Sequence, residues 1–278
     1  MKFNLKKIAA MLLIIILMLG TCVSGEAESL MPEHGETQTN RSLTIDRSHA
    51  SDGYIIVKAT ESNSKLKIAI SFNGESKIHY TLNTKGEEEI LPLQYGDGRY
   101  TVALFRQISG TRYQKDGEIS FSVKMTDKRG YMLYPNQWVN YTNETAAVAY
   151  ATELCAGMTD EYEIVMTIYK FINQHFGYDW FKSRDVKSGV LTEILPDIDG
   201  TWESRSGICQ DLAAVMCAML RSQGIHTRLV VGTYGSAPHA WITIYYHNAE
   251  GKFVQLSLDP TYHCRVTANA SYKAERYY

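Results

Sequence analysis

The chain has 278 residues, of which 45% are hydrophobic and 21% are charged, and its formal net charge is −2. That length is enough for one large domain or two smaller ones, each with its own core. The near-neutral charge and the lack of a long basic block argue against nucleic acid as a partner.

The first 25 residues have the layout of a secretory signal. Lys2, Lys6 and Lys7 precede an apolar run from Ile8 to Gly20, and polar sequence follows it. Because this run is too short to span a bilayer comfortably, we expect residues 1–25 to direct export. The predicted location is therefore outside the cell or on the outer face of the cell membrane.

Two processing routes are compatible with this signal. The segment "LGTC" resembles a bacterial lipoprotein box in which Cys22 carries the lipid, although Thr21 stands where that box usually has Gly, Ala or Ser. The alternative is ordinary cleavage near Gly25 or Ala27. In either case, contact with a membrane is expected only through the signal or the lipid anchor.

The next part of the chain predicts a polar linker and a β domain. Residues 26–41 are polar and are expected to form a flexible tether. In "KLKIAISF" (residues 65–72) apolar and polar side chains alternate, "NG" follows as a turn signal, and "KIHYTL" alternates again. Several such segments predict an immunoglobulin-like β-sandwich over residues 42–130, in which no reactive groups converge. We expect this domain to act as a spacer or a binding module.

Beyond Pro135 the hydrophobic period becomes helical. Asp160 and Glu163 form a capping-box pattern in front of one helix. A later helix lies within "GICQDLAAVMCAMLRSQGI", which runs from Gly207 to Ile225, and it is apolar over most of its circumference. Such a helix is expected to be buried, and Gly224 is expected to end it.

Strands follow this helix, in "TRLVVGTY", "HAWITIYY" and "FVQLSLD". Helices followed by antiparallel strands are typical of an α+β domain, which we assign to residues 134–278. If the last two strands form a symmetric hairpin centred on Ala249, His239 lies opposite Asp259, with Cβ atoms ~5 Å apart. The two-residue period then puts Trp241 on the His239 face, and the whole inference depends on the register of the hairpin.

Cys209, His239 and Asp259 together suggest a nucleophile, its base and a residue that orients the base. Cys209 begins the buried helix, where the positive end of the helix dipole stabilises a thiolate. His239 can donate and accept the proton of an acyl-transfer reaction while Asp259 orients the imidazole. Gly207 is expected to let the backbone approach a substrate, and the amide of Cys209 is expected to bind an oxyanion. The alternative is that all three side chains are structural.

Four motifs occur in order between about Tyr134 and Thr261: "GICQD", "AMLRSQGI", "HAW" and "LDPT". This ordered set resembles the transglutaminase-like superfamily, with its Cys–His–Asp triad in that chain order. The resemblance implies a papain-like core and thiol acyl-transfer chemistry with no cofactor. It makes Cys209 the nucleophile, His239 the base and Asp259 the orienting residue.

The resemblance also implies an upstream side chain that completes the oxyanion hole. Tyr178 in "FGYDW" and Trp202 are the candidates. Metal ligation is not expected, because the Cys and His spacings lack a paired-ligand pattern. The sequence allows one disulfide among Cys155, Cys217 and Cys264 and does not select the pair.

The reaction itself has two forms that the same triad serves. Water as acceptor gives a cysteine peptidase or amidase, whereas an amine gives a cross-linking transglutaminase. We expect a peptide or protein substrate, a monomer, and hydrolysis, because a single small domain offers no obvious second site for an amine donor. A non-catalytic cell-surface binding module is the remaining alternative.

Overall fold

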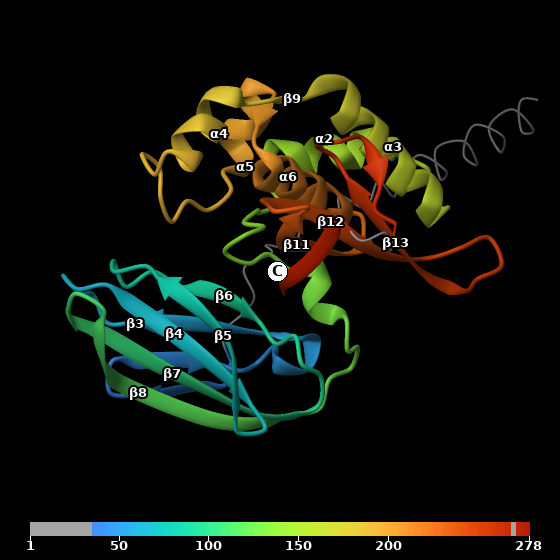
Figure 1. Ribbon diagram of the computed structural model, residues 1–278. Coiled ribbons are helices and arrows are strands. Elements are labelled where there is room, and N and C mark those ends of the chain that lie inside the picture. The colour runs from blue at the N-terminus through green and yellow to red at the C-terminus, as the bar shows by residue number, and fades with distance from the viewer. Residues whose placement is uncertain (1–34, 268–270) are drawn as a thin grey trace, which may run out of the picture.

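The computed structural model describes residues 35–267 and 271–278 (Figure 1). The predicted signal, the lipoprotein box with Cys22 and the first part of the tether therefore lie outside the described residues. Within the described ranges, no helix is both long and apolar enough to cross a bilayer.

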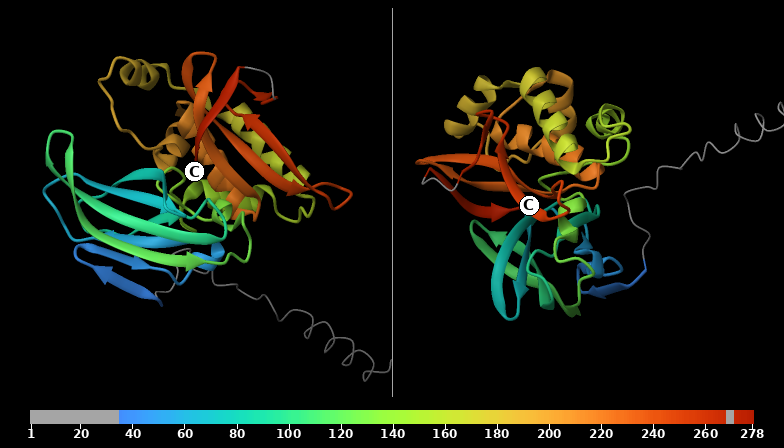
Figure 2. Two further views of the ribbon diagram at one scale, coloured as in Figure 1. Left: turned by 60° about the horizontal axis from the view of Figure 1, so that its bottom comes forward. Right: turned by 90° about the vertical axis from the view of Figure 1, so that its right-hand side faces the viewer.

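The N-terminal part consists of two four-stranded antiparallel sheets. The first has the order β1 (Thr37–Asn40), β2 (Leu43–Asp46), β3 (Tyr54–Ala59) and β6 (Glu89–Pro92). The second has the order β5 (Glu75–Leu82), β4 (Leu66–Phe72), β7 (Gly98–Ser109) and β8 (Arg112–Val123). The sheets lie one over the other in Figure 2, and their buried side chains form part of one hydrophobic core. The prediction of an N-terminal β-rich region is confirmed.

Local sequence patterns account for these strands. Leu66, Ile68 and Ile70 are completely buried in β4, as the alternation predicts. The "NG" turn joins β4 to β5, with Phe72 paired to Glu75.

The predicted tether is wrong at its C-terminal end. Residues 37–40 form strand β1, which is antiparallel to β2, with Thr37 opposite Asp46 and Asn40 opposite Leu43. All four side chains of β1 are exposed and polar, so no hydrophobic alternation marks the strand in the sequence. Main-chain hydrogen bonding to β2 holds this edge strand, and that pairing depends on the rest of the sheet.

Two short 3₁₀ helices occur in the chain: η1 (Ala50–Asp52) lies between β2 and β3, and η2 (Gly130–Leu133) follows β8. The C-terminal part, after η2, is an α+β domain. Its helices are α2 (Ala146–Leu154), α3 (Glu161–His175), α4 (Trp180–Lys187), α5 (Ile198–Ser204) and α6 (Cys209–Ser222). Its five-stranded sheet has the order β14 (Cys264–Arg265), β13 (Phe253–Asp259), β12 (Ala237–His247), β11 (His226–Tyr234) and β15 (Tyr272–Tyr277). The two-residue strands β9 (Gly177–Tyr178) and β10 (Ser206–Gly207) pair in parallel.

Helix α6 lies at the centre of this domain. It contacts β11 and β12 of the sheet on one side and α2, α3 and α5 on the other (Figure 1). Its side chains from Leu212 to Leu220 are buried, which confirms the prediction from their apolar character.

The predicted helix ends are also found. Asp160 caps α3, because its carboxylate accepts a hydrogen bond from the Glu163 amide at 2.8 Å. Gly224 follows α6 with a φ of +76°, and the Ile225 amide donates to the Leu220 carbonyl at 3.1 Å. This is the Schellman arrangement, in which a left-handed glycine turns the chain away from the helix.

The β12–β13 hairpin has a different register from the predicted one. Phe253 pairs with His247 and Leu258 pairs with Ile242, so the turn is centred on Glu250 instead of Ala249. Each residue of β13 is therefore displaced by two positions along β12. Because side chains alternate with a period of two, an even displacement leaves both sets on their predicted faces.

Candidate active site

Cys209 is the first residue of α6, and buried polar contacts fix this end of the helix. The Asp211 carboxylate is completely buried and accepts a hydrogen bond from the Ile208 amide at 3.0 Å. The same carboxylate forms an ion pair with Lys182 of α4, at 2.7 Å. The start of α6 is thereby held in one place.

The first-turn amides of α6 bear on the chemistry of the thiol. The amides of Asp211 and Leu212 both donate to the Ile208 carbonyl. An α-helix offers no internal acceptor to the amide of its first residue, so the N–H of Cys209 is left free. The Cys209 side chain thus lies at the positive end of the helix dipole, next to a hydrogen-bond donor.

His239 and Asp259 meet at one end of the sheet. The Nε2 atom of His239 lies 2.7 Å from Oδ2 of Asp259, and both side chains are buried. The other carboxylate oxygen, Oδ1, accepts hydrogen bonds from the amides of Thr261 at 2.8 Å and Tyr262 at 3.1 Å. The two residues are not directly opposite each other but are diagonal neighbours on the same face of β12 and β13. Long side chains at diagonal positions of a sheet can still reach each other.

The imidazole of His239 also forms a hydrogen bond with the Cys209 thiol. Because Nε2 is engaged by Asp259, Nδ1 is the nitrogen that faces the sulfur. Burial alone lowers the pKa of His239, but the hydrogen bonds and negative charges of Asp259 and Cys209 outweigh it and raise the pKa to about 9. The structure thus brings together the three residues that the sequence singled out.

Asp259 keeps its charge in this site. Burial raises the pKa of its carboxyl group, but hydrogen bonds and charge from His239, Tyr272 and the Tyr262 amide outweigh burial and lower the pKa overall. An ionised Asp259 therefore faces a protonated His239 at neutral pH.

The sequence did not reveal several residues that surround the imidazole. The phenol of Tyr272, on β15, donates a hydrogen bond to Oδ2 of Asp259 at 2.7 Å. The rings of Tyr262 and Tyr234 lie 5.1 Å and 6.1 Å from the imidazole, measured between ring centres. No spacing in the sequence connects these tyrosines to His239, because the three lie on separate strands or turns.

Two of the candidate residues lie beside the triad. Trp241 is buried on β12, and its ring centre is 6.2 Å from that of His239. Tyr178 is brought close to Cys209 by the pairing of β9 with β10, in which Tyr178 is opposite Gly207. The Tyr178 hydroxyl donates to Ser183 at 3.2 Å, so its proton is already committed to that contact.

Trp202 is not part of this group. Its ring packs against Tyr150, Phe171 and Phe176, and the Arg205 guanidinium lies 3.7 Å from its ring centre. Trp202 thus belongs to an aromatic cluster between α5 and the other helices, and its role in the oxyanion hole stays a prediction that these contacts do not support.

Gly207 has a packing role that the sequence did not indicate. A Cβ atom at this position would lie 2.7 Å from Cβ of Asp211 and 3.0 Å from Cγ2 of Thr201. The glycine is therefore required by close packing against α5 and α6, and its role in the approach of a substrate stays a prediction.

The four cysteines of the described residues, Cys155, Cys209, Cys217 and Cys264, are all free. Burial raises the pKa of the Cys217 thiol to about 12, so this second cysteine of α6 is unreactive. In the described ranges, no group of three or more His, Cys, Asp or Glu side chains is arranged to hold a metal ion.

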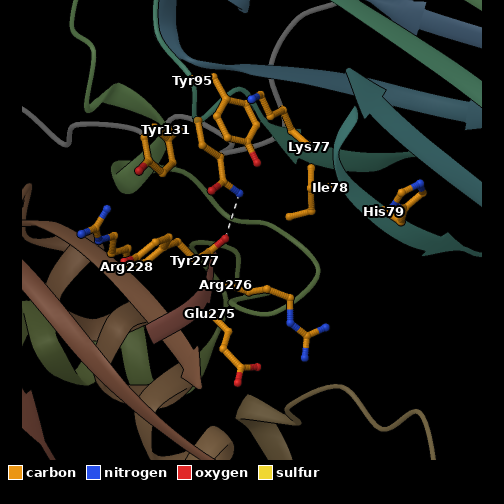
Figure 3. A pocket seen from close by; sticks show the side chains of 10 residues that line it. Lys77, Ile78, His79, Tyr95, Tyr131, Arg228, Glu275, Arg276 and Tyr277 are labelled. Carbon is orange, nitrogen blue, oxygen red and sulfur yellow. Dashed lines mark hydrogen bonds between the residues drawn. The ribbon is translucent and has the colours of Figure 1, made fainter. Parts of the chain in front are cut away.

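A cavity of about 440 Å³ lies elsewhere, between the N-terminal sheets and the C-terminal sheet. Figure 3 shows side chains from β5, η2, β11 and β15 around it. Gln94 spans the two parts of the molecule by donating a hydrogen bond to the Tyr277 carbonyl at 2.8 Å. None of the triad residues lines this cavity.

Comparison with protein families supports the sequence resemblance. Residues 148–257 match the model of the transglutaminase-like superfamily. The predicted transglutaminase-like core is thus confirmed over this range, which contains Cys209 and His239. Asp259 lies two positions beyond the end of the match. A search of curated proteins gives no match.

Several solved structures are similar at low identity. A proposed cysteine protease from Cytophaga hutchinsonii is 14% identical, with 82% of this chain and 78% of that chain covered and a TM-score of 0.39. The periplasmic domain of TgpA from Pseudomonas aeruginosa, bound to ethylmercury, is 16% identical, with 74% and 91% covered and a TM-score of 0.36. Red sea bream transglutaminase is 13% identical, with 81% and 53% covered and a TM-score of 0.30. TM-scores this low carry no argument about substrate or reaction.

Proposed function

We propose that this chain, with its transglutaminase-like core at residues 148–257, is a thiol-dependent acyl-transfer enzyme that acts on peptide or protein amide bonds. One observation carries the proposal. The Cys209 thiol at the start of α6 is hydrogen-bonded to His239, which is in turn hydrogen-bonded to the buried, ionised Asp259. A structural role for all three would not require this continuous chain of contacts at a helix N-terminus.

In the first half of the reaction, the Cys209 thiolate attacks the carbonyl carbon of the amide and forms a tetrahedral oxyanion. The free amide of Cys209 donates a hydrogen bond to that oxygen. The intermediate collapses when the C–N bond breaks, and the His239 imidazolium gives its proton to the departing amine. The acyl group is then held as a thioester on Cys209.

In the second half, an acceptor resolves the thioester. The neutral His239 takes a proton from the acceptor, which attacks the acyl carbon, and the C–S bond breaks to restore the thiolate. We propose water as this acceptor, which makes the protein a cysteine peptidase or amidase. The support is the one small α+β domain, which offers no obvious second site for an amine donor.

The first experiment tests whether Cys209 is an activated nucleophile. Residues 24–278 are expressed and treated with iodoacetamide at pH 6, and alkylation of each cysteine is followed by peptide mass spectrometry. We expect fast alkylation of Cys209, and alkylation at least tenfold slower after His239→Ala, because the imidazolium no longer stabilises the thiolate. Cys217 provides an internal control for a buried thiol. Slow alkylation of Cys209 that does not depend on His239 would leave the non-catalytic binding module as the better explanation.

A second measurement separates hydrolysis from amine transfer. The protein and its Cys209→Ala variant are incubated with a denatured protein substrate, with and without a fluorescent primary amine. New peptide termini that require Cys209 support a peptidase. Covalent incorporation of the amine without new termini would instead identify a transglutaminase.

We propose further that the protein is exported through residues 1–25 and acts as a monomer outside the cell or on the outer face of its membrane. The basic and apolar layout of that segment supports export, and the mass of the mature N-terminus distinguishes lipid attachment at Cys22 from ordinary cleavage. We also propose that residues 42–130 are an immunoglobulin-like spacer or binding module, on the basis of their two stacked antiparallel sheets.

A further inference from the structure

The carboxylate of Asp259 receives two strong hydrogen bonds on the same oxygen. Oδ2 lies 2.7 Å from Nε2 of His239 and also 2.7 Å from the Tyr272 hydroxyl. His239 comes from the strand next to Asp259, whereas Tyr272 comes from β15, which β12 and β11 separate from β13 in the sheet order. A residue from a strand that is not adjacent to β13 thus donates a hydrogen bond to the oxygen that orients the imidazole.

Packing fixes the direction of the Tyr272 ring. Tyr272 is paired with Tyr234 at the end of β11, and their ring centres are 4.7 Å apart. The ring of Trp241 meets that of Tyr272 edge-on, with the centres 5.1 Å apart. Held between these rings, the phenol reaches across the end of the sheet to Asp259.

The phenol is a donor throughout the pH range in which the site works. Burial raises the pKa of Tyr272, and hydrogen bonding to Asp259 and Cys264 raises it further, so the hydroxyl keeps its proton. That one proton is donated to Asp259. The Sγ atom of Cys264 also lies 3.6 Å from the Tyr272 hydroxyl.

We propose that Tyr272 is a positioning residue of the triad, which holds Oδ2 of Asp259 toward the imidazole and withdraws negative charge from that oxygen. This inference rests on the proposed function, because it gives Tyr272 a part in the acid–base work of His239. A carboxylate that shares its charge with a phenol attracts the imidazolium proton less strongly than an unshared one. His239 is thereby kept acidic enough to protonate the leaving amine.

The test compares Tyr272→Phe with Tyr234→Phe in the mature chain. Both variants lose one hydroxyl from the same aromatic group, but the Tyr234 hydroxyl makes no hydrogen bond to Asp259. The imidazole of His239 is titrated by NMR in histidine-labelled protein, and its signal is assigned with His239→Gln. Thermal unfolding of each variant shows whether the fold is retained.

We expect Tyr272→Phe to raise the pKa of His239 above that of the wild type by roughly half a unit to one unit, because Oδ2 loses a donor and becomes more basic. Tyr234→Phe should leave the titration unchanged. An unchanged or lowered pKa of His239 in Tyr272→Phe would overturn the proposal, as would an equal shift in both variants. The NMR titration requires no turnover, so its result stands apart from the alkylation test of the proposed function.

Discussion

At the scale of single residues, Asp259 and Cys209 set the acidity of His239. Burial alone lowers the pKa of the imidazole, but its interactions with Asp259 and Cys209 outweigh burial and raise the pKa to about 9. In the proposed reaction, acylation converts the Cys209 thiolate into a neutral thioester and removes a negative charge beside His239. We expect the pKa of His239 to fall at that point, so that the acid of the first half of the proposed reaction becomes the base of the second.

The first prediction concerns the pH dependence of the acylation step. Because the imidazolium supplies the proton to the leaving amine, we expect the acylation rate to fall as the pH rises through about 9. Asp259→Asn removes a negative charge that raises the pKa of His239, so the fall should move to lower pH. The rate is measured from pH 6 to pH 10, with the exposed Asp199→Asn as the control. Superimposable profiles for Asp259→Asn and the wild type would contradict this account.

At the scale of secondary structure elements, the start of α6 is where several elements meet. Lys182 from α4 and Thr201 from α5 both contact the first turn of the helix or the glycine that precedes it. The position of the Cys209 sulfur therefore depends on close packing around Gly207 and Asp211. A small displacement here moves the Cys209 thiol away from His239, which is held independently by the sheet.

We predict that Gly207→Ala damages both stability and reactivity. The added methyl group would overlap Asp211, so the free energy of unfolding should fall by about 1–3 kcal/mol and alkylation of Cys209 should slow. Gly177→Ala is the matched control, because Gly177 lies on the paired strand β9 and a Cβ there meets nothing within 4 Å. Urea unfolding and iodoacetamide labelling measure the two effects. Equal behaviour of the two variants would show that packing at Gly207 does not position the helix.

At the scale of the whole molecule, the two parts share one hydrophobic core. The C-terminal end of the chain lies where they meet (Figure 2). The buried ring of Tyr278 stacks on Trp138, with the ring centres 4.5 Å apart, and meets Tyr80 of β5 at 6.3 Å. The buried Arg221 of α6 donates hydrogen bonds to the main-chain oxygens of Tyr134 and Tyr278. The contact between Tyr278 and Tyr80 joins the N-terminal sheets to the domain that carries the triad, and Arg221 ties Tyr278 to α6.

Because the core is continuous, we predict that the mature chain unfolds in a single cooperative transition. Residues 134–278 expressed alone should expose the apolar surface around Tyr278 and should be markedly less stable than the same residues in the full chain. Calorimetry of the full chain and binding of a hydrophobic dye to the fragment measure these effects. Two well-separated transitions, or a fragment as stable as the full chain, would show that the parts fold independently.

Features that depend on neighbouring residues could be predicted from the sequence. The Asp160 cap, the Gly224 helix end and the alternation in β4 were predicted because each depends on the spacing of a few residues. The shared face of His239 and Asp259 was predicted for the same reason, and it survived an error in the register because the error was even. The three triad candidates came from the helix start, the faces of the hairpin strands and the order of the motifs.

Contacts between side chains that are distant in the sequence could not be predicted in this way. Strand β1 has no apolar pattern, Trp202 lies in a different cluster, Gly207 is required by packing, and Tyr272 reaches Asp259 from a strand at the edge of the sheet. Such contacts depend on the order of the strands and on which elements pack together, and a spacing along the chain does not encode either. The physical reason is that a local pattern fixes the face of one element, whereas a contact between elements requires all of the intervening chain to be in place.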